Sequence, residues 1–321
     1  MADTHDSKSC TARCEGSSPS SGTMKKIVCI VGQTATGKSD LAVEIAKKYN
    51  GEIISADSRQ VYRWLNIGSG KITKREMKGV RHHLLNVADP RKERYTAADF
   101  AAAAKSAASD ILSRGKLPIV CGDTGFYIEA FFHDGNLPNV PPNPKLRAKL
   151  TKLSAEALMK ELRRLDPVRA KNIDSLNKIR IIRAIEIARV LGKVPKQKSK
   201  KNYDVLSIGL TLSPEILKSK IHARLAKRMR GNALIKEVCD LRRRGISWKR
   251  LHDFGLEYRY AASYLQKKLP RERILSELER EIYRYAKRQM TWFKRDKKVK
   301  WFSPKEKGRI DRETKSFIKK N

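Results

Sequence analysis

The feature that most constrains this chain is the loop GQTATGKS at residues 32–39, which follows a short apolar run and precedes a helix-like stretch. The run Ile27–Val31 is rich in β-branched residues, as in a strand buried on both faces, and Asp40–Tyr49 is predicted to be helical. Glycines let the backbone N–H groups of such a loop turn toward an oxyanion, and the helix N-terminus adds its positive dipole. The setting therefore predicts a phosphate-binding loop of the G-x-x-x-x-G-K-[ST] type.

The loop supplies a set of candidate phosphate ligands. Lys38 adds a point charge, and Ser39 stands where such loops contact Mg²⁺, the cofactor we expect. The loop motif alone does not identify the phosphate compound that binds there. The candidate diphosphate ligands are Gly32, Gln33, Thr34, Ala35, Thr36, Gly37, Lys38 and Ser39.

Apolar runs that alternate with helical segments, notably Ala97–Ser113, predict an α/β fold with a parallel sheet covered by helices, like that of P-loop NTPases. Beyond a Pro/Asn-rich linker, short basic helices extend to about Val194, and the strand pattern then resumes. Residues 139–199 are therefore predicted to form a helical insertion in the core. The expected strands are Ile27–Val31, Glu52–Ser55, His83–Val87, Leu117–Cys121 and Val205–Leu210.

The remaining segments complete the predicted organisation. Residues 24–138 and 200–302 are assigned to the catalytic core, and the chain after Pro214 is predicted to be almost entirely helical. Residues 303–321 are interpreted as a basic tail. Residues 1–23 are polar and rich in Ser and Gly, so they are expected to be a disordered extension or an overextended start upstream of Met24.

The charge of the chain indicates the class of partner. Seventy-one Lys and Arg residues against 34 Asp and Glu give a formal net charge of +37, which favours a polyanion such as nucleic acid. A hydrophobic fraction of 40% is enough for a buried core. Apolar runs stay well below the roughly 20 residues of a membrane span, so no membrane partner is expected. The scattered cysteines, five in number, favour a reducing, cytoplasmic location.

Two acidic residues follow predicted strands at the edge of the sheet where parallel-sheet sites form. Asp57 is placed to coordinate Mg²⁺, to accept a proton or to cap the following helix. Asp123 follows the strand Leu117–Cys121 and would either join a metal shell or cap the next helix.

In the helix that contains Arg180 and Arg183, these two arginines lie one turn apart and share a face.

Several blocks together resemble the tRNA dimethylallyltransferase family of bacterial type, also called tRNA isopentenyltransferases or IPP transferases. They occur in that family's order and cover roughly residues 24–302. The blocks are GQTATGKS, ISADSRQVYRWLNIGSGK, HHLLNVADP, GDTGFYIEA, RIIRAIEIARVLGK, YAKRQMTWFK and VKWF.

This resemblance implies a prenyl transfer from dimethylallyl diphosphate to N6 of the adenosine 3′ of the anticodon in tRNA, with release of diphosphate. Lys38 and Arg224 would hold the departing diphosphate, Asp57 would take the N6 proton, and Thr124 would lie near the target nucleotide. The implied tRNA contacts are Asp57, Ser58, Arg59, Gln60, Arg180, Arg183, Arg288 and Gln289. The expected partners are the anticodon stem-loop of tRNA and dimethylallyl diphosphate, and a monomer is expected.

The sequence departs from the family pattern at two places. Asp123 occupies a position where the family commonly has a glycine. Around Arg228–Val238 the alignment can slip by one residue, which weakens any role for Arg228 more than for Arg224.

Three alternative functions stay open at this stage. A P-loop kinase of a small molecule would use Lys38 and Asp57, although such kinases rarely need a charge of +37. An adenylate isopentenyltransferase would carry out the same chemistry on a free nucleotide. A non-enzymatic RNA-binding module would not require the intact Gly-Lys-Ser sequence of the loop.

Overall fold

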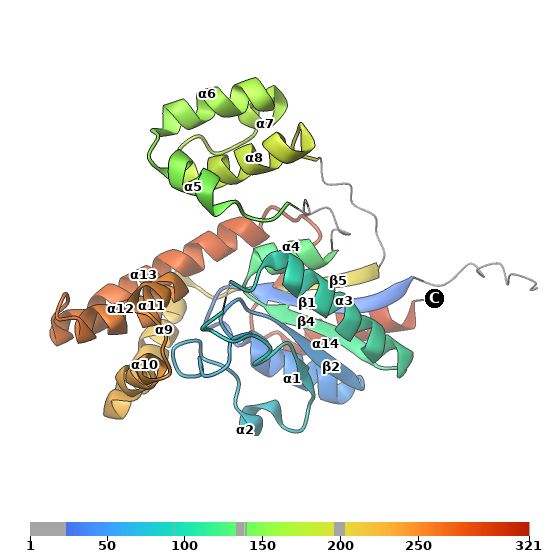
Figure 1. Ribbon diagram of the computed structural model, residues 1–321. Helices are drawn as coiled ribbons and strands as arrows, with labels where there is room; N and C mark the ends of the chain where they lie inside the picture. The colour runs from blue at the N-terminus through green and yellow to red at the C-terminus, as the bar shows by residue number, and fades with distance from the viewer. Residues whose placement is uncertain (1–23, 93, 133–137, 139, 196–202, 321) are drawn as a thin grey trace, which may run out of the picture.

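The computed structural model describes residues 24–92, 94–132, 138, 140–195 and 203–320, and its core is one parallel sheet. Six strands lie in the order β3-β2-β4-β1-β5-β6, and every pair of neighbours is parallel (Figure 1). The expected N-terminal extension at residues 1–23 lies outside the described residues. The strands are β1 (Lys25–Gly32), β2 (Gly51–Ala56), β3 (His82–His83), β4 (Leu117–Gly122), β5 (Tyr203–Leu210) and β6 (Lys300–Phe302).

The alternation of side chains along each strand explains how helices cover both faces of the sheet. On one face, Ile27 and Cys29 of β1 join the core formed with α3 (Ala97–Ser113) and α4 (Gly125–Phe132). Val28 of β1 points to the opposite core, which contains α1 (Lys38–Lys48). Burial on both faces is why these strands read as continuous apolar runs. The predicted α/β class with a P-loop-type parallel sheet is confirmed.

The other helices fall into two groups along the chain. The first group carries the insertion and the second forms most of the C-terminal half, together with the 3₁₀ turn Arg230–Asn232. The bounds are α2 (Lys74–Met77), α5 (Pro144–Thr151), α6 (Ala155–Leu165), α7 (Pro167–Lys171), α8 (Lys178–Leu191), α9 (Pro214–Met229), α10 (Ala233–Arg243), α11 (Trp248–Phe254), α12 (Leu256–Leu265), α13 (Arg271–Phe293) and α14 (Lys307–Lys319).

The strand predicted at His83–Val87 is wrong in extent, because β3 contains only His82 and His83. Leu84 and Asn86 have φ angles of 64° and 58°, in the left-handed region that a strand cannot contain. The apolar residues that suggested a longer strand belong to a loop, in which Leu84 still packs into the core.

Helices α5 to α8 fall within the range predicted as an insertion, and they pack around an apolar cluster of their own. Leu158, Leu162, Ile181 and Ile185 are its fully buried members. Figure 1 shows this group of helices on one side of the sheet domain, beyond the end of α13. A separate cluster is the sign of a unit with its own core.

The segment interpreted as a basic tail is folded onto the sheet domain. Residues 300–302 form the edge strand β6, and α14 places Ile310 and Thr314 in the core with 1% and 0% of their surfaces exposed. The many lysines concealed this amphipathic helix because they occupy its solvent-facing side. Residues 307–319 are therefore an amphipathic helix that packs on the sheet domain and exposes a basic face.

Helices α9 and α13 pack against each other and bring the C-terminal half to the phosphate-binding loop. Leu217, Ile221 and Leu225 of α9 form a cluster with Leu278 and Ile282 of α13.

Among the described residues, no helix is long and apolar enough to cross a membrane.

Candidate active site

The loop between β1 and α1 has the geometry of a phosphate cradle. Gly32 is required at its start, because a Cβ there would lie 2.3 Å from the carbonyl oxygen of Leu210 and the φ angle is +134°. The Lys38 ammonium folds back over the loop and donates to the Gln33 carbonyl at 2.6 Å. Burial lowers the pKa of Lys38, against the opposing effect of Asp123. A buried cation close to the backbone of such a loop is suited to bind a phosphate oxygen.

Helix α13 holds the phosphate-binding loop in place through a hydrogen bond from the loop's backbone to Gln289. The Gln289 Oε1 atom accepts from the Thr34 backbone N–H at 2.8 Å, and its Nε2 atom donates to the Asp123 carbonyl at 3.4 Å. Gln289 was expected at the tRNA interface, but only 4% of its surface is exposed. Its amide instead links the loop to the end of β4, so the structure gives it a positioning role.

Asp57 follows β2 directly and is half-buried in a tight turn. Its Oδ1 atom accepts from the backbone N–H groups of Arg59 at 2.8 Å and Gln60 at 3.2 Å, and Oδ2 accepts from the Gln60 side chain at 3.0 Å. Burial, and then the Asp123 carboxylate, raise the pKa of Asp57 to about 6. The cap that Asp57 forms belongs to a turn, because the next helix begins only at Lys74. A carboxylate poised in this range is suited to accept a proton near neutral pH.

Thr124 and Ser58 lie beside Asp57 because β2 and β4 pair with Ala56 opposite Gly122. The Thr124 hydroxyl accepts from the Ser58 backbone N–H at 3.0 Å. The Arg59 guanidinium donates through Nε to the Phe254 carbonyl at 2.5 Å. The predicted stretch from Asp57 to Gln60 therefore lies together at the carboxyl end of the sheet.

Asp123 lies at the end of β4, where it acts electrostatically on Lys38 and Asp57. Burial, and then Asp123, also raise the pKa of Tyr285 on α13 well above its usual value. Ser39 is exposed at the first turn of α1. A hydroxyl and carboxylates at one sheet edge are hard oxygen donors of the kind that Mg²⁺ prefers, so these residues fit that ion.

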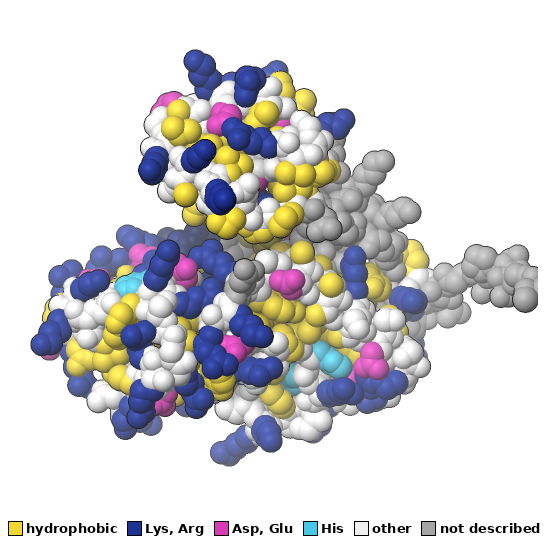
Figure 2. Space-filling model, viewed as in Figure 1, with side chains coloured by type: hydrophobic (Ala, Val, Ile, Leu, Met, Phe, Trp, Pro, Cys, Tyr) yellow, Lys and Arg dark blue, Asp and Glu magenta, His cyan; other side chains and the backbone are white. Residues whose placement is uncertain are grey.

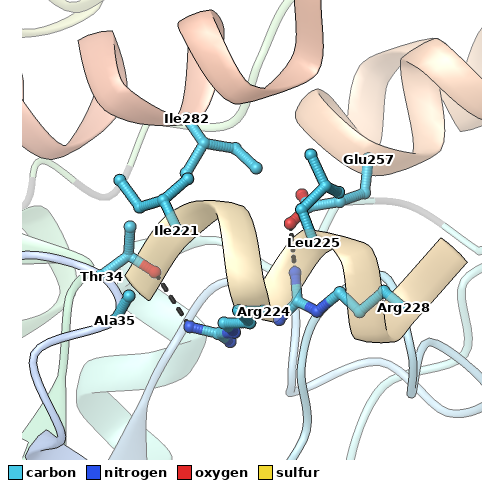
Figure 3. A pocket seen from close by; sticks show the side chains of 8 residues that line it. All are labelled: Thr34, Ala35, Ile221, Arg224, Leu225, Arg228, Glu257 and Ile282. Carbon is cyan, nitrogen blue, oxygen red and sulfur yellow. Dashed lines mark hydrogen bonds and ion pairs between the residues drawn. The ribbon is translucent and has the colours of Figure 1, made fainter. Parts of the chain in front are cut away.

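Arg224 on α9 reaches the phosphate-binding loop across a small cavity (Figure 3). Its Nη1 atom donates to the Thr34 hydroxyl at 3.1 Å. Burial, and then the neighbouring Arg228, lower the pKa of Arg224. This contact places Arg224 against the phosphate-binding loop and not on a solvated face of α9. The cavity is lined by Thr34, Ala35, Ile221, Arg224, Leu225, Arg228, Glu257 and Ile282.

A buried carboxylate that sequence reasoning missed organises the loop after Leu65. Glu237 accepts from the backbone N–H groups of Asn66 at 2.9 Å, Ile67 at 2.7 Å and Gly68 at 3.0 Å. The Tyr258 hydroxyl donates to the same carboxylate at 2.9 Å. The paired glycines of the GSG sequence at 68–70 were the available signal, but the partners come from helices far along the chain.

The predicted tRNA contacts outside this centre lie on two elements. Arg180 is exposed on α8, whereas Arg183 donates to the Val140 carbonyl at 2.7 Å and contacts Glu186 at 3.3 Å. Arg288 is exposed on α13, with its guanidinium 5.8 Å from the Tyr285 ring. Figure 2 shows Lys and Arg side chains gathered over the part of the molecule formed by α9 to α13.

The fold and the site together define a P-loop protein of the parallel-sheet class, with a phosphate-binding loop and a carboxylate at the carboxyl end of the strands. A family profile described as IPP transferase matches residues 60–296. The chain therefore belongs to the IPP transferase family.

Individual relatives agree with this assignment. The tRNA dimethylallyltransferase of Anoxybacillus flavithermus is 38% identical over 284 residues, which cover 87% of this chain and 90% of the relative. The enzyme of the same name from Caldanaerobacter subterraneus is 36% identical over 289 residues, covering 86% of this chain and 91% of the relative.

Solved structures show the same fold. The tRNA isopentenylpyrophosphate transferase of Bacillus halodurans superposes with a TM-score of 0.68 at 34% identity, covering 92% of this chain and 98% of that one. A eukaryotic dimethylallyltransferase that acts on tRNA gives a TM-score of 0.72 at 28% identity, covering 84% of this chain and 69% of that one.

Proposed function

We propose that this protein transfers a dimethylallyl group from dimethylallyl diphosphate to N6 of the adenosine 3′ of the anticodon in tRNA, and releases diphosphate. The observation that carries the proposal is the position of Asp57. Its carboxylate, with a pKa of about 6, faces the same sheet edge as the phosphate-binding loop, within electrostatic reach of Lys38. A kinase would use such a loop for ATP, but the family assignment favours the prenyl donor.

In the proposed reaction, the N6 atom attacks the allylic carbon of the donor. The N6–carbon bond forms as the carbon–oxygen bond to diphosphate breaks, and Asp57 accepts the N6 proton. An adenine amine is a weak nucleophile, so a base within hydrogen-bond reach contributes to the rate. The hydrogen bonds from Arg59 and Gln60 hold Asp57 in one orientation before the base arrives.

The departing diphosphate gains negative charge as the bond breaks. Lys38 contacts the loop at Gln33 and Arg224 contacts it at Thr34, and the loop itself adds backbone donors. Preorganised positive groups of this kind lower the barrier because they require no reorganisation during the reaction. Thr34 and Thr124 provide hydroxyls beside the diphosphate and the acceptor base.

Mg²⁺ bound at Ser39, with Asp123 as a further oxygen ligand, would neutralise part of the diphosphate charge. We assign the tRNA contacts to the exposed arginines of α8 and α13 and to the basic surface of α9 to α13. The net charge of +37 supports a long polyanion as the acceptor, in preference to a free nucleotide. A monomer in the cytoplasm is part of this proposal.

The test is an incubation with anticodon stem-loop RNA, dimethylallyl diphosphate and Mg²⁺, followed by nucleoside analysis by mass spectrometry. The expected product is adenosine that carries one dimethylallyl group on N6. A parallel reaction with AMP measures transfer to a free nucleotide, and a third with labelled ATP measures kinase activity. Phosphate transfer without prenylation, or prenylation of AMP in preference to RNA, would refute the proposal.

A further inference from the structure

The loop at Gly70 brings two guanidinium groups to one point. Gly70 has a φ angle of +60°, and a Cβ at that position would lie 1.9 Å from Nη2 of Arg228 and 2.1 Å from Nη2 of Arg224. The two nitrogen atoms are therefore no more than about 4 Å apart, which is the sum of these two distances. Two like charges this close repel each other strongly unless an anion lies between or beside them.

Of the two terminal nitrogen atoms of Arg228, Nη1 has hydrogen-bond partners and Nη2 has none. Its Nη1 atom donates to the Gly68 carbonyl at 3.2 Å and forms an ion pair with Glu257. Its Nη2 atom is buried and has no hydrogen-bond partner, the one side-chain atom in this condition in the described part of the chain. Only 10% of the side chain is exposed. Buried polar groups are nearly always satisfied, so this nitrogen marks a missing acceptor.

Only one of the two guanidiniums at this point has an ion-pair partner among the described residues. Glu257, whose side chain is 12% exposed, forms an ion pair with Arg228, whereas Glu257, Asp123 and Asp57 act on Arg224 only at longer range. Figure 3 shows both guanidiniums on the same side of α9, with Arg224 directed to Thr34 and Arg228 to Glu257. Because Thr34 belongs to the phosphate-binding loop, the excess positive charge lies beside the diphosphate cradle.

We propose that Arg228 is a second guanidinium ligand of the diphosphate, which holds one phosphate group together with Arg224. We assign to Glu257 the role of a counter-ion that competes with the diphosphate for Arg228 and so limits how tightly the product is held. This inference rests on the proposed function only in assigning the diphosphate to a prenyl donor. Arg228 and Arg224 recur at a spacing of four on α9, so one helix face presents both.

The experiment is calorimetric titration of the full-length protein with inorganic pyrophosphate in the presence of Mg²⁺. Arg228→Gln is expected to weaken binding about 10- to 100-fold, the range for one lost charge-assisted hydrogen bond. Glu257→Gln is expected to tighten binding about 3- to 10-fold, because it releases the guanidinium from its competitor. The matched control is Lys227→Gln, which removes a positive charge from an exposed neighbour on the same helix and should change affinity less than about twofold.

The opposite sign of the two effects separates a ligand role from a structural one. If the ion pair only supported the fold, both Arg228→Gln and Glu257→Gln would weaken binding, and that result would overturn the inference. Unchanged affinity in Arg228→Gln would overturn it as well. If Arg228→Gln fails to fold, the Glu257→Gln titration decides alone. Pyrophosphate binding is read without any prenyl transfer, so a protein that shows these shifts but modifies no RNA would refute the proposed function and leave this inference standing.

Discussion

Replacing Asp57 by asparagine should slow the reaction and stabilise the protein at the same time. The substitution keeps the shape of the side chain and an oxygen that can accept from the Arg59 and Gln60 backbone N–H groups. It removes the proposed acceptor of the N6 proton, so turnover should fall roughly 10²-fold or more, as is typical for loss of a general base. RNA binding should persist, because the turn is preserved.

The stability effect follows from the pKa. Burial raises the pKa of Asp57 from 3.8 to about 6, a difference of about 2 units that corresponds to at most about 3 kcal/mol. A raised pKa favours the protonated form in the folded state, so its contribution is complete below pH 3.8 and is lost as the pH rises through about 6. Because the group is half-buried, we expect Asp57→Asn to raise the free energy of unfolding by about 1 to 2 kcal/mol at pH 8 and by about zero at pH 3.5.

The assay is urea denaturation of both proteins at several pH values between 3.5 and 8, followed by circular dichroism. Asp174→Asn is the matched control, since Asp174 is exposed on the insertion and its Oδ1 atom likewise accepts from a backbone N–H two residues ahead, that of Leu176 at 3.1 Å. In parallel, kcat/KM of the unmodified protein should fall about tenfold per unit below pH 6. A stability difference that is constant with pH, or full turnover in Asp57→Asn, would refute the reasoning.

Three further predictions test the surroundings of the site. Gly70→Ala should weaken pyrophosphate binding about tenfold or more, because the added Cβ would displace both guanidiniums. The control is Gly79→Ala, at a φ of +82° with open space around it, which should cost only about 1 kcal/mol of stability. Equal pyrophosphate affinities in the two variants would contradict this prediction. Glu237→Gln should lower the free energy of unfolding by about 3 kcal/mol and raise KM for the prenyl donor. The reason is that an amide oxygen cannot accept all the hydrogen bonds that the carboxylate accepts from Asn66, Ile67, Gly68 and Tyr258. Denaturation measures the first effect and initial rates the second, and an unchanged KM would argue against the positioning role. Affinity for the anticodon stem-loop should decrease steeply with salt, with a slope in log–log coordinates of about −0.7 to −0.9 per phosphate contacted, and a flat profile would remove the electrostatic argument.

Local sequence patterns were enough for the elements that depend on their immediate neighbours. The apolar run of β1 and the glycines of the loop specify a buried strand and a phosphate cradle, because both depend on residues adjacent in the chain. Asp57 could be placed at the sheet edge for the same reason. The short extent of β3 could not be read, because it is set by the left-handed conformations of Leu84 and Asn86.

The sequence by itself determined the fold class and the phosphate-binding loop, and it predicted a polyanionic partner, since periodicity, motif spacing and net charge are properties of the chain alone. Only the tertiary structure decided that α14 belongs to the core, that Gln289 supports the loop from inside, and that Arg228 meets Arg224 at Gly70. These contacts join residues more than 150 positions apart in the sequence, and they depend on the packing of α9 and α13 against the sheet domain. Local patterns carry no record of that packing, because it is fixed by the shapes of surfaces that exist only after the helices have docked.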